Sequence, residues 1–262
     1  MKLAVSNIAW QQELDEEIYA LMKKHGFEGV EIAPTRIVGE HPYEKSAKAK
    51  EWQEEINEKY GFVIPSMQSI WYGKQERLFG DEKEQKELLL YTKKAIDFAK
   101  EIKCHNLVFG CPKNRNLLEG RNARKAILFF RQLGEYALAQ GVVIGMEANP
   151  AIYNTNYINY TKEAIELIKE VNVKGFKLNL DVGTMIQNRE QVEELQGQVQ
   201  KISHVHISEP GLKVIEKRKL HKELKECLEA EEYQGFISIE MSRQDDIEII
   251  NETLCYIKEI FG

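Results

Sequence analysis

Short apolar segments alternate with longer amphipathic segments along the whole chain. The apolar segments have the length and the Val, Ile, Leu and Phe content of buried strands, and they span residues 2–6, 29–33, 62–67, 106–110, 142–147, 176–181, 202–207 and 236–241. Charged segments with helical periodicity lie at 12–25, 43–60, 81–103, 120–140, 160–171, 188–199, 217–231 and 244–260. Strict alternation predicts a parallel sheet in an α/β fold, and eight repeats predict a single (β/α)8 TIM barrel.

The absence of linkers and the regular placement of glycines predict one domain over residues 1–262. Neither a low-complexity segment nor a linker interrupts the pattern. An open doubly wound sheet would also alternate, but it usually carries a glycine-rich turn after its first strand, and "SNIAWQQE" has none. Glycines precede five of the predicted strands, where each is expected to end a helix in the left-handed conformation: Gly26, Gly61, Gly141, Gly175 and Gly235.

Metal-competent side chains stand at the carboxyl ends of the last four predicted strands. They are Glu147, Asp181, His206 and Glu240. A lone carboxylate after a strand is most often a helix N-cap or a turn residue. Four such residues on adjacent strands, at the end of a barrel where catalytic groups gather, favour a shared metal ion. Three carboxylates and one imidazole suit Mn²⁺, Mg²⁺ or Co²⁺ as the one divalent cofactor, with zinc left open.

The residues two positions earlier on these strands point in the same direction. They are small or polar: Gly145, Asn179, His204 and Ser238. We expect Asn179 and His204 to form hydrogen bonds that support the metal ligands, because buried polar groups need partners.

Glu147 and Glu240 come from strands three apart, so they could face opposite sides of a bound substrate. Such a pair can remove a proton from one face of a carbon and return it to the other face. The metal would bind neighbouring carbonyl and hydroxyl oxygens and stabilise an enediolate.

Loops at the same end offer further contacts to a substrate. We expect Glu31 and Gln68 to bind sugar hydroxyls, and Lys113 and Arg115 to bind a phosphate or carboxylate group. Trp71, Tyr72 and Tyr153 are expected to line the mouth, and the remaining candidates for substrate contact are Trp10, Asn149, Glu209 and Arg243.

Five segments resemble the xylose-isomerase-like TIM barrels, also called sugar phosphate isomerase/epimerases. The segments are "GFEGVEIAP", "GMEANP", "LNLDVGTM", "HVHISEP" and "ISIEM", and the resemblance covers nearly the whole chain. It implies metal ligation by the four residues at the strand ends, with Glu147 and Glu240 as the acid/base pair. Two positions depart from ketose 3-epimerases of this family. Thr184 stands where a histidine is usual, and residues 210–212 lack the arginine that usually follows the glutamate at 209.

The expected function is therefore a divalent-metal-dependent isomerase or epimerase of a small sugar, sugar phosphate or related ketose. The first alternative is a metal-dependent dehydratase, a lyase acting on an inosose or keto-sugar through the same enediolate. A non-catalytic sugar-binding barrel is a further alternative. An AP-endonuclease-like hydrolase would need additional histidines where Gln68, Phe109 and Thr184 stand.

Composition limits the partners and the cellular location that we expect. A net charge of −6 argues against nucleic acid as a partner. The apolar run at residues 1–10 is too short to predict a signal peptide, and no long uncharged apolar segment is present, so we expect no membrane partner. Its four cysteines form no CxxC pair, which favours reduced thiols and a cytoplasmic location. The resemblance implies a homodimer or homotetramer.

Overall fold

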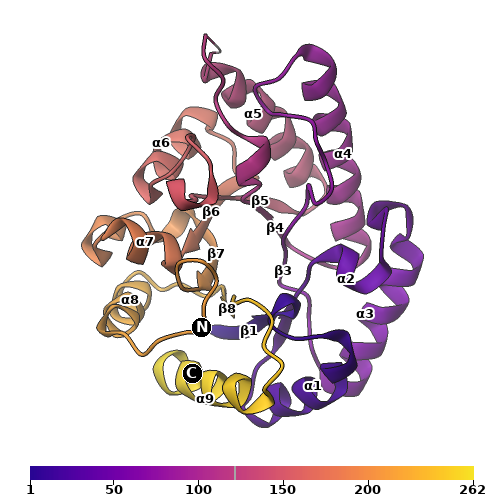
Figure 1. Ribbon diagram of the computed structural model, residues 1–262, viewed down its shortest axis with the longest axis vertical. Helices are drawn as coiled ribbons and strands as arrows, with labels where there is room; N and C mark the ends of the chain where they lie inside the picture. Colours follow the sequence, from indigo (N-terminus) through magenta and orange to yellow (C-terminus); the bar gives the residue numbers. More distant parts are fainter. Residues whose placement is uncertain (121) are drawn as a thin grey trace.

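Eight parallel strands form the centre of the molecule (Figure 1). The computed structural model describes residues 1–120 and 122–262. The sheet has the order β2-β1-β8-β7-β6-β5-β4-β3, and isolated parallel bridges from Gly29 to Val63 and from Ile32 to Met67 join its two edges. The sheet therefore closes into a barrel. Its strands are β1 Lys2–Ser6, β2 Gly29–Glu31, β3 Ser66–Met67, β4 Asn106–Phe109, β5 Val143–Glu147, β6 Phe176–Asp181, β7 Ile202–Ile207 and β8 Phe236–Ile239.

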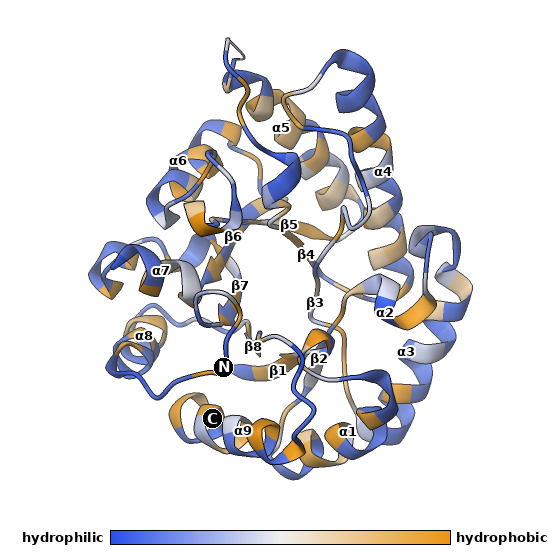
Figure 2. Cartoon of the chain, in the orientation of Figure 1, coloured by the Kyte–Doolittle hydropathy of each residue, from blue (hydrophilic) through white to orange (hydrophobic). Residues whose placement is uncertain are grey.

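Helices surround the barrel and turn their apolar faces toward it (Figure 2). They are α1 Asp15–Lys24, α2 Pro34–Val38, α3 Ser46–Tyr60, α4 Glu82–Glu101, α5 Arg124–Ala139, α6 Thr161–Val171, α7 Val182–Asn188, α8 Lys219–Ala230 and α9 Ile247–Phe261. This arrangement confirms the predicted (β/α)8 barrel. Within the described residues, no helix is both long and apolar enough to cross a bilayer.

The prediction of a helix over 188–199 is wrong. Helix α7 begins directly after β6, because the Asp181 side chain caps it by accepting a hydrogen bond from the Thr184 backbone N–H. It ends at Asn188, because the C-cap residue Arg189 has a left-handed backbone with φ 58°. Only short 3-10 turns follow, at Val192–Leu195 and Val199–Lys201. The predicted strand 62–67 is also shorter than expected, since only Ser66–Met67 pairs as a strand.

Three of the five glycines behave as predicted. Gly26, Gly61 and Gly141 have φ values of 73°, 79° and 75°. The prediction is wrong for Gly175 and Gly235, because the left-handed positions after those helices fall on Asn172, with φ 51°, and Glu232, with φ 57°. Gly175 instead permits a close approach between segments, since an added Cβ would lie 2.0 Å from the Gly134 carbonyl oxygen.

The interior of the barrel below its carboxyl end is polar. Asn106 donates to Ser66 Oγ at 3.0 Å and accepts from Ser203 Oγ at 2.8 Å. His204 Nε2 lies 2.9 Å from Ser238 Oγ. These groups satisfy one another, so the layer that supports the mouth is held by hydrogen bonds rather than by apolar packing.

Candidate metal centre

The structure brings together all four predicted metal ligands at the carboxyl end of the barrel. Glu147 and Asp181 are the last residues of β5 and β6, His206 lies in β7, and Glu240 follows β8. One ligand atom from each side chain lies within 4.8 Å of those of the other three. None of the four residues is more than 8% exposed. Strand pairing contributes to this convergence, since Asp181 and His206 are register partners.

The spacing of the donor atoms fits a divalent cation. His206 Nδ1 lies 3.0 Å from Glu147 Oε1 and 3.3 Å from Glu240 Oε2. Ligands about 2.1 Å from an octahedral ion are separated by roughly 3 Å along each edge. A donor set of three carboxylates and one imidazole is chemically suited to such an ion.

Asp181 is fixed by two neighbouring hydroxyl groups as well as by the backbone. The Thr184 backbone N–H donates to Asp181 Oδ2 at 2.7 Å, and the Thr184 hydroxyl lies at the same distance from that oxygen. Ser208 donates to Asp181 Oδ1. Asp181 is therefore both a helix cap and a candidate ligand. Thr184, which departs from the histidine usual in ketose 3-epimerases, contributes to holding it.

Glu147 is oriented by two amide side chains. Asn149 Nδ2 donates to Oε2 at 2.8 Å, and Asn179 Nδ2 donates to Oε1 at 2.9 Å. The predicted hydrogen bond from Asn179 to a ligand is thus present. The polar contacts of His204 are with Ser238 and Glu31, so hydrogen bonding links His204 to the candidate ligand His206 only through Glu31.

Replacing Gly110 by alanine is expected to weaken divalent-metal binding by about 10- to 100-fold, the range typical for disturbing the support of a ligand. A Cβ at this position, just after β4, would lie 2.8 Å from Glu147 Oε2 and 3.3 Å from Asn149 Oδ1. The Glu147 carboxylate would have to move and lose one of its two amide contacts. Titration with Mn²⁺ measures the affinity, and wild-type affinity in a folded variant would contradict this role for Gly110.

Without a bound cation, the carboxylates of Glu147, Asp181 and Glu240 repel one another. Burial raises the pKa of Asp181 to about 7, with contributions from Glu147 and Glu240. Burial also raises the pKa of Glu240, despite the opposing effect of His206. Burial lowers the pKa of His206, but Glu240 and Glu31 outweigh it and hold that pKa well above its ordinary value. A bound cation would relieve the repulsion among the carboxylates.

This repulsion predicts a pH dependence of the metal-free protein. Because the folded-state pKa of Asp181 is raised to about 7, its protonated form favours folding, and that contribution is lost as pH rises toward 7 and above. In chelator, the wild type should lose about 2–3 kcal/mol of unfolding free energy relative to Asp181→Asn between about pH 5 and about pH 8. Parallel urea unfolding curves measure the difference. An equal pH dependence of both proteins would contradict it.

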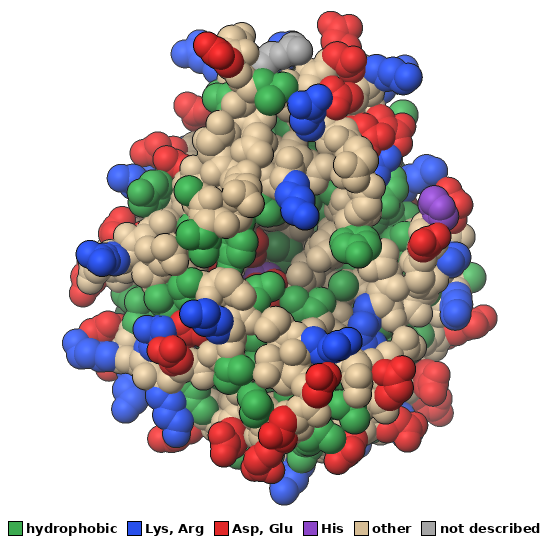
Figure 3. All heavy atoms as spheres, in the orientation of Figure 1, with side chains coloured by type: hydrophobic (Ala, Val, Ile, Leu, Met, Phe, Trp, Pro, Cys, Tyr) green, Lys and Arg blue, Asp and Glu red, His purple; other side chains and the backbone are tan. Residues whose placement is uncertain are grey.

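A cavity of about 560 Å³ opens above the four side chains, and Glu147, Asp181 and Glu240 line it. Figure 3 shows the molecule hollowed at its centre, with acidic and histidine side chains at the floor of the hollow. Three of the predicted substrate-binding residues, Gln68, Lys113 and Asn149, also line the cavity, and so do Trp71, Tyr72 and Tyr153.

Two predicted substrate contacts, Trp10 and Arg115, lie outside this cavity. Trp10 is 1% exposed and donates from Nε1 to Asp15 Oδ1 at 2.7 Å. Arg115 is fully buried and donates to the backbone carbonyls of Glu147, at 2.7 Å, and Ile158, at 3.1 Å. The Trp10 ring N–H and the two terminal guanidinium nitrogens of Arg115 are bound within the protein, so the structure does not support the predicted contacts with a substrate.

Glu209 and Arg243 do not line the cavity either. Arg218 binds the Glu209 carboxylate through two contacts of 2.6 Å, which occupy both oxygens. Arg243 is exposed and lies 3.4 Å from Asp245 Oδ1. The structure therefore supports neither prediction.

Sequence reasoning missed two contributors to the site, Ser208 and Gly110. Ser208 lies two residues beyond His206, so the alternation that identified His204 could also have identified it. Gly110 follows a predicted strand, but only the structure shows that its missing side chain leaves room for Glu147.

The comparisons with known proteins agree with this architecture. Residues 19–260 match the xylose isomerase-like TIM barrel family, and the chain belongs to that family. No curated protein sequence matches the chain significantly.

Solved structures of similar fold include several sugar epimerases. D-psicose 3-epimerase from Clostridium cellulolyticum H10 has a TM-score of 0.80 and 16% identity, with complete coverage of both chains. The 3-keto-D-glucoside 4-epimerase YcjR from E. coli has a TM-score of 0.77 and 20% identity over 99% of each chain. The IOLI protein with a binding zinc atom has a TM-score of 0.71 and 18% identity, covering 99% of this chain and 96% of its own. At these identities the likeness establishes the fold.

Proposed function

We propose that the protein is a divalent-metal-dependent isomerase or epimerase of a small sugar, sugar phosphate or related ketose. The observation that carries this proposal is the convergence of Glu147, Asp181, His206 and Glu240 at the floor of the cavity. Family membership and the sugar-epimerase titles of similar structures support the substrate class. Mn²⁺, Mg²⁺ or Co²⁺ suits the oxygen-rich donor set, and the zinc in the IOLI structure keeps zinc among the candidates.

When bound, the metal would act as a Lewis acid that polarises a substrate carbonyl and favours an enediolate. The protein itself would move the proton. Glu147 is held by Asn149 and Asn179, so its carboxylate is already oriented toward the cavity. Glu240, which follows β8, lines the same cavity, so the two carboxylates could act on one bound substrate from different strands.

The walls of the cavity fit a small polar molecule. Gln68 and Asn149 offer amide groups, and Trp71 and Tyr72 offer aromatic surfaces that suit the apolar faces of a sugar. Lys113 is exposed at the same cavity and could bind a phosphate or carboxylate group.

Solvent-deuterium exchange tests the proposed reaction directly. The protein, loaded with Mn²⁺ in D₂O, is incubated with a panel of ketoses, ketose phosphates and keto-glycosides. Incorporation of deuterium at the carbon beside the carbonyl, without loss of water, is the expected result. Exchange accompanied by loss of a β-hydroxyl would indicate the dehydratase, and binding without exchange across the panel would indicate a sugar-binding barrel.

A further inference from the structure

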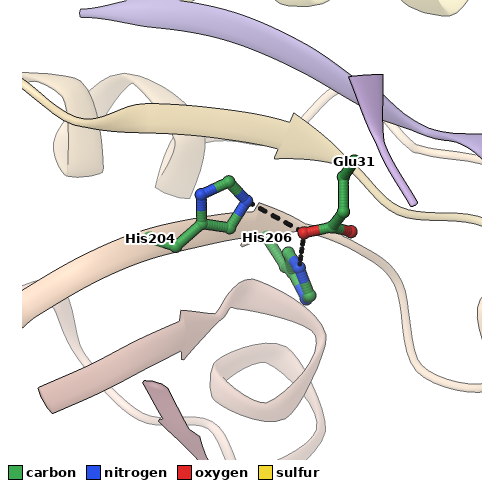
Figure 4. Close-up of side chains that lie close together, drawn as sticks. All are labelled: Glu31, His204 and His206. Atoms are coloured by element: carbon green, nitrogen blue, oxygen red, sulfur yellow. Dashed lines mark hydrogen bonds and ion pairs between the residues drawn. The ribbon is translucent and has the colours of Figure 1, made fainter. Parts of the chain in front are cut away.

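Glu31 occupies an unexpected position beneath the metal ligands. The residue ends β2 and is fully buried, and it is not part of the cavity wall. The expectation that it binds sugar hydroxyls is therefore not supported. Figure 4 shows its carboxylate between two imidazole rings. The same oxygen, Oε2, lies 2.8 Å from His206 Nε2 and 3.0 Å from His204 Nε2.

The contact with His206 selects which ring nitrogen can bind a metal. A carboxylate accepts hydrogen bonds, so the Nε2 atom that faces Glu31 carries a proton. The other nitrogen, Nδ1, faces Glu147 and Glu240. A cation that binds at Nδ1 replaces any proton there, while the hydrogen bond at Nε2 keeps the ring in place. Such a hydrogen bond also makes the imidazole a stronger ligand.

Glu31 is itself held by side chains from β7 and from the residue that follows β3. Gln68 Nε2 donates to Glu31 Oε1 at 3.1 Å and to Ser6 Oγ at 2.8 Å. His204 shares Oε2 with His206. Both oxygens of the carboxylate thus have donors, and contacts with Gln68, His204 and His206 fix its position.

An alternative is that Glu31, His204 and His206 hold an ion of their own, because their ligand atoms also lie close together. Hydrogen bonding explains the arrangement better. Each of the three residues is at most 1% exposed, and the two histidines supply the N–H donors that a buried carboxylate needs. An ion there would displace the proton from His206 Nε2 and take away its hydrogen bond to Glu31.

We infer that Glu31 is a positioning residue that fixes the orientation and tautomer of His206 for metal binding. The inference rests on the proposed metal centre. Replacing Glu31 by glutamine is expected to weaken Mn²⁺ binding by about 10- to 100-fold, the usual effect of removing such a supporting group. Isothermal titration of the chelator-treated protein with Mn²⁺ measures the affinity, and the visible spectrum of the Co²⁺-loaded protein reports the ligand geometry.

Glu190→Gln is the matched control, because it removes another buried carboxylate with two donors. Glu190 Oε1 accepts from the Thr161 backbone N–H at 3.2 Å and from Asn188 Nδ2 at 2.9 Å. This variant should keep wild-type Mn²⁺ affinity and the wild-type Co²⁺ spectrum. If Glu31→Gln fails to fold, Glu31→Asp retains the charge but shortens the reach to His206, and it should also bind Mn²⁺ more weakly than the wild type.

The outcomes separate the inference from the proposed function. A folded Glu31 variant with wild-type affinity and an unchanged Co²⁺ spectrum would overturn the role of Glu31 alone. A wild-type protein that binds no Mn²⁺ or Co²⁺ would overturn the metal centre, and the inference would fall with it. A lower unfolding midpoint in chelator with unchanged affinity would show that Glu31 only stabilises the fold, which also contradicts the inference.

Discussion

Replacing Glu240 by glutamine should reduce proton exchange at the substrate carbon by about 10²- to 10⁴-fold, the contribution typical of a general acid or base. Glutamine keeps nearly the same shape and retains an oxygen that can face the metal, but it cannot take up a proton. Glu240 lines the cavity and lies 3.3 Å from His206 Nδ1. The variant should therefore lose catalysis while it retains most of its affinity for the substrate.

Single-turnover deuterium exchange measured by NMR, on protein of known metal content, gives the rate for this comparison. Glu190→Gln again serves as the control, because this buried carboxylate accepts hydrogen bonds from Thr161 and Asn188, and none of these three residues lines the cavity. The control should exchange at the wild-type rate. Exchange by Glu240→Gln at that same rate would remove Glu240 from the acid/base role.

Replacing Asp181 by alanine should abolish the stabilisation that a divalent metal gives to the wild type. With free metal at 100 times its dissociation constant, the wild type should gain about 2.7 kcal/mol of unfolding free energy. The variant lacks one of the four converging ligands, so it should gain almost nothing at that concentration. Thermal unfolding with and without Mn²⁺, together with elemental analysis, measures the effect.

The cap at Asp181 complicates this comparison and calls for its own control. Alanine also removes the hydrogen bond to the Thr184 N–H, and loss of an N-cap costs about 1 kcal/mol. Asp246→Ala removes a comparable cap, from the Glu248 N–H at the start of α9, without touching the centre. That control should be destabilised yet should retain the full metal effect. Full metal occupancy in Asp181→Ala would show that Asp181 is not a ligand.

The barrel could be predicted from the sequence because each repeat carries its own periodic signal. The error over 188–199 has a local cause. The polar pattern there is compatible with a helix, but capping by Asp181 starts α7 immediately after β6, and Arg189 ends it. The start of the helix at Val182 rather than at 188 depends on a side-chain contact, and hydrophobic periodicity carries no information about such a contact.

The candidate ligands could be located for a related reason. Strand alternation and the carboxyl ends of parallel strands place Glu147, Asp181 and His206 without knowledge of any loop. No comparable periodic pattern predicts the direction of side chains in loops. Arg115 resembled an anion-binding residue in sequence, yet it binds backbone carbonyls, and Glu209 pairs with Arg218 nine residues away. The sequence predicts which loop carries such a residue, but the group that its side chain binds depends on tertiary packing.

We propose that one divalent ion binds among the side chains at the ends of the last four strands. A crystal structure of the Mn²⁺-loaded protein, with an anomalous difference map, tests it most directly. We expect one strong peak per chain, within about 2.0–2.3 Å of side-chain atoms of Glu147, Asp181, His206 and Glu240. A fully occupied ion at another place, or no ion in protein saturated with Mn²⁺, would show that these four side chains do not form a metal centre.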